Sequence, residues 1–213
     1  MGKVDNRDKD AKPNLSVEYE IIVRDKNGKI IEHRREESKS LVKNFLLLLN
    51  AAFRISYSTV VDTSGTAQNA STKCHYGEWG NDKRLRKCYG GWAPSAGEGR
   101  DSFGIVIGTG DTPVTADDYN LESKIAHGIG AGQLYYYETV LYSPVIAETE
   151  ITQEFRRAFR NGSGADITVK EIGLIVNIVC DNYKVMIIRD VITPLTIPDG
   201  ATYTVKYFIK TSL

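Results

Sequence analysis

A glycine-rich stretch, GIVIGTGDTPVTADDYNLESKI at Gly104–Ile125, is the part of the sequence that most suggests phosphate chemistry. A phosphate loop needs glycines whose backbone N–H groups face the anion, and a Walker loop also needs Gly-Lys-Ser/Thr. No lysine follows Gly108-Thr109-Gly110 at that spacing, and the third glycine of a dinucleotide-binding loop is missing. The four carboxylates that follow would repel a phosphate: Asp111, Asp117, Asp118 and Glu122. The stretch therefore does not predict a nucleotide site.

The same carboxylates could instead serve a calcium ion. An EF-hand loop needs oxygen ligands at alternate positions and a closing glutamate, and the spacing here does not follow that pattern. An ordinary turn explains more, because Pro113 stops the strand and Thr115 can cap a one-turn helix with Asp118 as its capping-box partner. We expect a strand end, a glycine turn and a short helix, with no metal and no cofactor.

Cysteines and histidines offer little other chemistry. Cys74-His75 and Cys88 could begin a zinc site, but the paired CxxC spacing and a fourth ligand are missing. A Cys74–Cys88 disulfide is the next alternative, and two free thiols are favoured over both. The sequence contains no Gly-x-Ser-x-Gly elbow, and His33 and His127 are far apart along the chain. We therefore predict no catalytic residue and no enzyme, while an all-β hydrolase with a convergent acid pair stays as an alternative.

Aromatic residues are the strongest candidates for contact with a partner. Four of them stand among Gly, Ser and Asn in a stretch without periodicity, at about 66–100: Tyr76, Trp79, Tyr89 and Trp92. A long loop of this kind is typical of a binding element, and exposed aromatics are common at interfaces. The alternative is a loop with an aromatic core of its own.

Two predicted strands carry further interface candidates. In LYYYETVLY, Tyr135 and Tyr137 share one face and Tyr136 takes the other, which suits a subunit interface or a sugar-binding surface. In EFRRAFR, Arg156 and Arg160 share a face and could reach acidic groups on a partner. Plain strand propensity and a solvated outer face are the alternatives.

The elements that must position these residues are mostly strands. Residues 1–14 are polar and predict a flexible N-terminal arm, and 15–213 predict one β-rich domain with the insertion loop at about 66–100. Asn27-Gly28 predicts a hairpin. Helical periodicity predicts one helix between residues 38 and 54, capped by Ser38 or Ser40 and covered on most sides by a sheet or a neighbouring subunit. Consecutive strands without intervening helices predict an antiparallel β-sandwich with one packed helix.

The composition limits the classes of partner that we expect. The 213 residues include 27 Lys+Arg and 27 Asp+Glu, so the net charge is zero and a nucleic-acid partner is not expected. The longest apolar run, FLLLL, is far too short for a membrane span, and the N-terminus has no apolar signal region. Three cysteines do not make a disulfide framework, which indicates a reducing cytoplasm as the place of synthesis.

Several segments in order resemble virion structural proteins of tailed bacteriophages and related tailed viruses. The segments are SLVKNFLLLLNAAF, DTSG, FGIVIGTG with TPVTADDYNLESKI, RAFRNGSGADITVKEIGLIV and MIIRDVITPLTIPDGATYTVKYFI. The resemblance implies a non-enzymatic building block of a capsid or tail, assembled in the host cytoplasm from copies of itself and other virion proteins. An N-terminal arm would order on a neighbouring copy. The alternative class is a carbohydrate- or receptor-binding β-sandwich module, for which a host-surface glycan is the partner.

Overall fold

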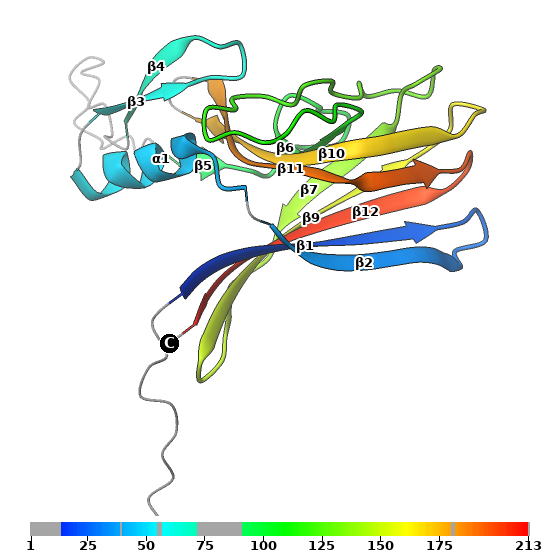
Figure 1. The fold of residues 1–213 in the computed structure, drawn as a ribbon, viewed down its shortest axis with the longest axis horizontal. Helices are drawn as coiled ribbons and strands as arrows, with labels where there is room; N and C mark the ends of the chain where they lie inside the picture. Colours follow the sequence, from blue (N-terminus) through cyan, green and yellow to red (C-terminus); the bar gives the residue numbers. More distant parts are fainter. Residues whose placement is uncertain (1–13, 39, 55–56, 72–90, 180–181, 213) are drawn as a thin grey trace, which may run out of the picture.

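The structure is a computed structural model that describes residues 14–38, 40–54, 57–71, 91–179 and 182–212. Over these residues the chain forms two stacked antiparallel sheets, a small two-stranded hairpin and one helix (Figure 1). The prediction of a mainly β, antiparallel sandwich with one packed helix is confirmed.

The larger sheet has six strands in the order β2-β1-β12-β9-β7, and β8 pairs with β9 beside β7. Its strands are β1 (Asn14–Arg24), β2 (Ile30–Ser38), β7 (Tyr135–Leu141), β8 (Val145–Ile146), β9 (Glu150–Arg160) and β12 (Thr202–Ser212). The first and the last described strands are neighbours along their whole length, from Asn14 opposite Ser212 to Arg24 opposite Thr202. The sheet is thus completed only by both ends of the described chain.

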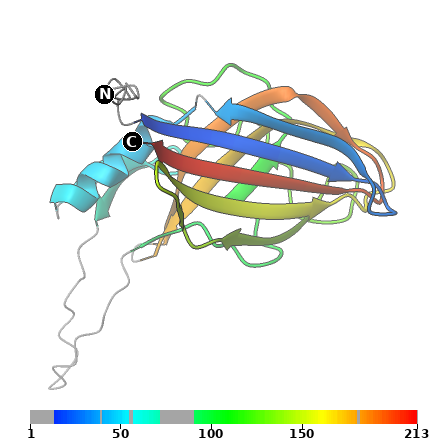
Figure 2. The ribbon, with the colours of Figure 1, turned by 90° about the horizontal axis from the view of Figure 1, so that it is seen from below.

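The second sheet has four strands, in which β10 pairs with β11 on one side and with β5 and β6 on the other. Its strands are β5 (Trp92–Ala93), β6 (Gly104–Gly108), β10 (Ile167–Ile178) and β11 (Tyr183–Ile197). The hairpin of β3 (Tyr57–Val61) and β4 (Ala67–Ser71) and the helix α1 (Lys43–Arg54) contact each other, and α1 also packs on β11. Figure 2 shows α1 at the end of the sandwich where β1 begins and β12 ends.

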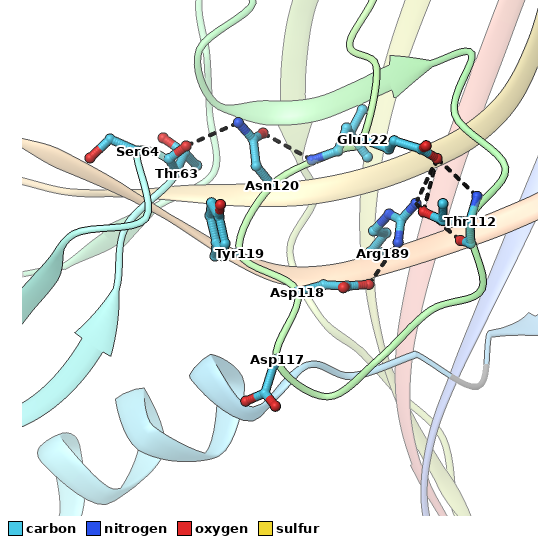
Figure 3. A pocket seen from close by; sticks show the side chains of 10 residues that line it. Thr63, Ser64, Thr112, Asp117, Asp118, Tyr119, Asn120, Glu122 and Arg189 are labelled. Carbon is cyan, nitrogen blue, oxygen red and sulfur yellow. Dashed lines mark hydrogen bonds and ion pairs between the residues drawn. The ribbon is translucent and has the colours of Figure 1, made fainter.

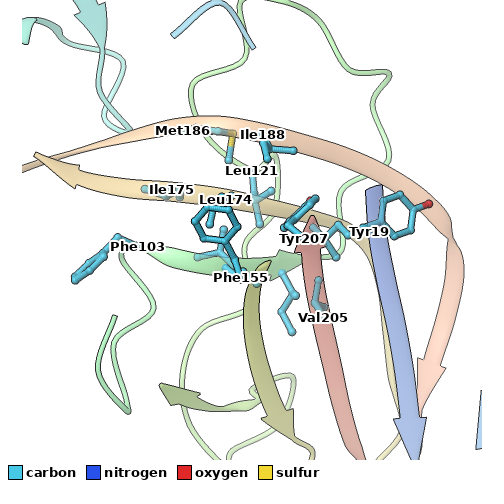
Figure 4. Packing of buried hydrophobic residues seen from close by; sticks show 14 of the residues in the cluster. Tyr19, Phe103, Leu121, Phe155, Leu174, Ile175, Met186, Ile188, Val205 and Tyr207 are labelled. Carbon is cyan, nitrogen blue, oxygen red and sulfur yellow. The ribbon is translucent and has the colours of Figure 1, made fainter. Parts of the chain in front are cut away.

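Strand alternation explains the core between the two sheets. Val17, Tyr19, Ile21 and Val23 all point inward from β1 and are buried. The same core includes the buried side chains of Leu174, Ile175, Met186 and Ile188 from β10 and β11. Figure 4 shows these four with Tyr19 of β1 and with Phe155, Val205 and Tyr207.

The outer face of β2, β1 and β12 carries charge instead. Glu18 receives hydrogen bonds from Arg35 and Lys210, both at 2.9 Å. Glu20 contacts Lys206 and His33, both at 2.7 Å. These cross-strand pairs fix a hydrated face and leave the opposite face to the core.

Two local predictions have different outcomes. The Asn27-Gly28 hairpin between β1 and β2 is confirmed, and Gly28 has the positive φ of 81° that its turn requires. The helix prediction is right in type but wrong at its start, since α1 begins at Lys43 and Ser38 ends β2. Within one copy the helix is covered only in part, because Leu46 is 64% and Phe53 82% exposed.

The predicted boundaries change in two places. Asn14, assigned to the arm, begins β1, and the other residues of the arm lie outside the described residues. The insertion predicted at about 66–100 contains β4 and β5, so part of it belongs to the fold. Residues 72–90 lie outside the described residues, and with them the interface candidates Tyr76, Trp79 and Tyr89 and the cysteines Cys74 and Cys88.

Candidate functional site

The glycine loop after β6 wraps around a carboxylate of the chain itself. Glu171, on β10, is fully buried. Its Oε1 accepts the backbone N–H groups of Gly110 at 3.1 Å and Ser123 at 2.7 Å. Its Oε2 accepts the N–H of Glu122 at 3.0 Å and the Nε–H of Arg189 at 3.0 Å. The N–H groups that a phosphate loop would turn to its ligand are therefore engaged by an internal anion.

Packing around this carboxylate explains the glycines. A Cβ on Gly108 would lie 2.5 Å from Oε1 of Glu171, and one on Gly110 would lie 2.5 Å from Cβ of Glu122. Neither distance is sterically possible without a shift of the loop or of Glu171. The Gly-Thr-Gly sequence thus serves close packing onto β10, which answers the question of phosphate binding that the sequence raised.

A polar pocket of about 430 Å³ lies beside the loop (Figure 3). We call it the Arg189 pocket, and its lining includes Ser64, Asp118, Tyr119, Glu122 and Arg189. Arg189 Nη1 donates to Asp118 at 2.7 Å, and Glu122 Oε2 accepts the N–H of Thr112 at 2.8 Å. Arg189 thus lies between Asp118 and Glu122, 3.9 Å from the latter, whereas Asp117 pairs with Lys43 outside the pocket.

The carboxylates of the Arg189 pocket are a poor match for hydrolysis. Burial opposes ionisation of Asp118, but hydrogen bonds from Arg189 and Thr115 outweigh it and lower its pKa. Hydrogen bonds from Thr112 lower the pKa of Glu122. A general acid needs a raised pKa, which neither carboxyl has. The short helix predicted here is wrong, since residues 115–118 form a turn. Thr115 and Asp118 do pair, because the Asp118 carboxylate accepts the N–H of Thr115 at 3.1 Å and its hydroxyl at 2.8 Å.

Arg157 is a second buried charge, and no carboxylate of the described residues forms an ion pair with it. It points inward from β9 and is fully buried. In the described part of the chain its guanidinium donates to backbone carbonyls alone, those of Tyr137, Phe103, Ile105, Gly97 and Arg100. The guanidinium carbon of Arg157 lies 4.8 Å from the centroid of the Tyr136 ring. Burial lowers the pKa of Arg157 to about 10. The residue ties the segment before β6 to β7 and β9.

Three of the predicted interface residues come together in a second pocket, of about 440 Å³. We call it the Tyr135 pocket, and it is lined by Glu98, Ile129, Tyr135, Tyr137, Arg160 and Gly162. Tyr135 and Arg160 are cross-strand partners on β7 and β9. The rings of Tyr135 and Tyr137 meet edge to face, with centroids 5.3 Å apart. Sequence spacing predicted the shared face of the tyrosines but not Glu98 or Ile129, which come from loops.

The remaining predicted residues take other places. Tyr136 is wrong as an interface candidate, because it is fully buried and its hydroxyl donates to the carbonyl of Ile125 at 2.6 Å. Arg156 lies outside the Tyr135 pocket, with its guanidinium 4.6 Å from the Tyr142 ring centroid. Trp92 is half-buried in β5 and packs against the core.

An apolar surface at the far end of the larger sheet was not predicted. Register places Leu15, Thr211, Ile151 and Ile146 side by side across β1, β12, β9 and β8. We call these four residues the apolar strip. Strand alternation puts them on the inner face of the sheet, and yet all four are exposed, Ile146 to 77%. In Figure 1 this end of the sheet curves away from β10 and β11, in agreement with the exposure of the strip.

Other kinds of site are less supported. Among the described residues no group of three or more His, Cys, Asp or Glu side chains is placed to hold a metal ion. No helix in the described part of the chain is long and apolar enough to cross a membrane. Comparison with family models, curated proteins and solved structures gave no match to this chain.

Proposed function

We propose that the chain is a non-enzymatic virion structural protein that acts by assembly with copies of itself and with other virion proteins. The observation that carries the proposal is the apolar strip. The resemblance of the sequence to structural proteins of tailed bacteriophages and related viruses supplies the virion class. The same resemblance supports a role in the assembled particle, after synthesis in the host cytoplasm.

The apolar strip is inner-face surface without a covering layer. Leu15, Ile151 and Ile146 have the same orientation as Val17 and Phe155, which are buried a few residues further along their strands. Burial of such a side chain contributes about 1.5–3 kcal/mol, so exposure of three in a row is costly. Contiguous exposed apolar surface is typical of protein–protein contact sites.

A second copy of the chain is the partner that fits the strip best. The strip contains no charged residue, and the chain as a whole has zero net charge, so two copies meet without repulsion. The same strip on each copy is self-complementary, as a two-fold interface requires. α1 lies at the same end of the sandwich with Leu46 and Phe53 exposed, which adds apolar area to that end (Figure 2).

The other edge strand of the larger sheet, β2, is protected against association by charged side chains. Its second half reads HRREES, and charged side chains of this kind disfavour edge-to-edge association. Ile31 on β2 is 46% exposed and stands apart from the strip. It therefore provides a matched control for any substitution in the strip.

Light scattering on the purified chain tests the proposal. Wild type is expected to form a discrete oligomer, and Ile151→Lys or Ile146→Lys is expected to shift it to monomer, while Ile31→Lys keeps the wild-type mass. Circular dichroism checks that each variant is folded. A wild-type chain that stays monomeric at every concentration, or lysine variants with unchanged mass, would refute assembly through the strip.

A further inference from the structure

The Tyr135 pocket lies at the opposite end of β9 from the apolar strip. Arg160 is the last residue of β9, whereas Ile151 of the strip is its second. At about 3.3 Å per residue, the two positions are about 30 Å apart. A ligand in this pocket would not touch the strip, so the two features can be tested separately.

The guanidinium of Arg160 is available to a ligand. Within the described residues it makes no hydrogen bond and no ion pair, and its side chain is exposed. Arg156, on the same face of β9, differs, because Glu154 holds its Nη2 at 2.7 Å and Tyr142 lies under it. A free guanidinium at the rim of a pocket can bind a carboxylate with two parallel hydrogen bonds.

The aromatic wall of the pocket is fixed in place. The hydroxyl of Tyr135 donates to Glu98 at 2.6 Å, and the His127 ring packs on Tyr135 with centroids 4.8 Å apart. The β-bulge between Tyr136 and Thr139 leaves Tyr137 exposed beside it. Rings that are held before a ligand arrives lose little freedom on binding.

Glu98 supplies a third kind of contact. One of its carboxylate oxygens accepts the Tyr135 hydroxyl, and the group keeps further lone pairs for donors on a ligand. Glu98 and Arg160 are the only charged residues that line the pocket among the described residues. A ligand must therefore bring hydrogen-bond donors for Glu98, an anionic group for Arg160 and an apolar face for the tyrosines and Ile129.

We infer that the Tyr135 pocket binds a pyranose that carries a carboxylate. The C–H face of such a ring packs on Tyr137 and Ile129, its hydroxyls donate to Glu98, and its carboxylate pairs with Arg160. A phosphate would gain only the contact to Arg160 and would face Glu98. A sugar acid uses all three kinds of contact, because it has hydroxyls for Glu98, a carboxylate for Arg160 and an apolar face for the exposed rings.

Calorimetry and saturation-transfer NMR with the full chain test this inference. The probes are glucuronic acid and N-acetylneuraminic acid, with glucose as the neutral match of the first. Arg160→Gln is expected to weaken binding of the acids by tenfold or more, as is usual for loss of a charge-assisted pair. Tyr137→Ala is expected to weaken it as well. The matched control, Arg156→Gln, is expected to leave it unchanged.

Each outcome decides the inference. Binding of either acid with the expected loss in Arg160→Gln supports it, and a preference between the two acids identifies the source as a uronic acid or a sialic acid. Absence of binding by both acids would overturn it. So would equal binding of glucose and glucuronic acid, or a folded Arg160→Gln variant with wild-type affinity. Ile151→Lys is expected to bind the acids normally, which separates this test from that of assembly.

Discussion

Replacement of Arg157 by methionine tests whether a buried cation organises the fold. Methionine keeps much of the length and the apolar stem but removes every donor. Four of the five hydrogen bonds from Arg157 to carbonyls are 3.1 Å or shorter, and the fifth, to Gly97, is 3.4 Å. The substitution removes a donor from each of these carbonyls, and the contacts to Phe103 and Ile105 are buried.

The expected magnitude follows from two opposing terms. Hydrogen bonds to a charged group contribute about 1.5–3 kcal/mol each, so four of them are worth at least roughly 6 kcal/mol. Burial lowers the pKa of Arg157 from its ordinary value to about 10. At about 1.4 kcal/mol per pH unit, this cost of holding the charge is roughly 3 kcal/mol. Arg157→Met is therefore expected to destabilise the protein by at least about 3 kcal/mol.

Urea unfolding followed by circular dichroism measures this loss, and a melting temperature lower by about 6–12 °C should accompany it. The control is Arg156→Met, one residue earlier on the half-exposed outer face. Its pair with Glu154 predicts a loss of less than about 1 kcal/mol. Equal losses in the two variants would refute the reasoning, because they would mean that the carbonyl contacts of Arg157 contribute nothing beyond those of a surface arginine.

Three further substitutions test the sites around the glycine loop and the core. Gly110→Ala should cost about 1–3 kcal/mol in urea unfolding because its Cβ meets Glu122, whereas Gly97→Ala, with no atom within 4 Å, should cost little; equal effects would contradict the packing argument. Burial raises the pKa of Asp190, so the folded state favours the protonated carboxyl. The contribution of this group to stability is therefore full at low pH and is lost as pH rises through the raised pKa. Asp190→Asn should therefore gain stability relative to wild type as pH rises in thermal melts, and a constant difference would contradict this. The pKa of Asp118 is lowered, so Asp118→Asn should destabilise at neutral pH and lose that effect as pH falls below the ordinary range of a carboxyl; a difference that persists in acid would argue against the pair with Arg189.

Strand alternation and turn chemistry were enough to predict the fold class. The β1–β2 hairpin follows from Asn27-Gly28 and from apolar residues at every second position, which are local signals. Helix boundaries were less predictable, because Ser38 looked like a cap. In the structure its hydroxyl bonds Asp190, a residue 152 positions away. No local pattern carries that contact.

Among the site residues, too, some follow from local patterns and others depend on contacts between distant parts of the chain. The shared face of Tyr135 and Tyr137 follows from the period of a strand, and Arg160 joins them through cross-strand register. The buried roles of Arg157 and Glu171 could not be predicted, because a charged side chain is expected at the surface. Both are buried because distant loops, at Gly97–Ile105 and Gly110–Ser123, wrap their backbone groups around the charge.

The pairing of β1 with β12 also sets the order in which the protein can fold. Glu18 and Lys210, which meet across this pair, are separated by 192 positions. A ribosome that adds about 5–20 residues per second needs roughly 10–40 s between them. During that interval the nascent β1–β2 hairpin shows its apolar face and one unpaired edge to the cell. Closure of the larger sheet is thus a late, long-range step, and until β12 arrives the edge of β1 that it covers is open to pairing with other chains.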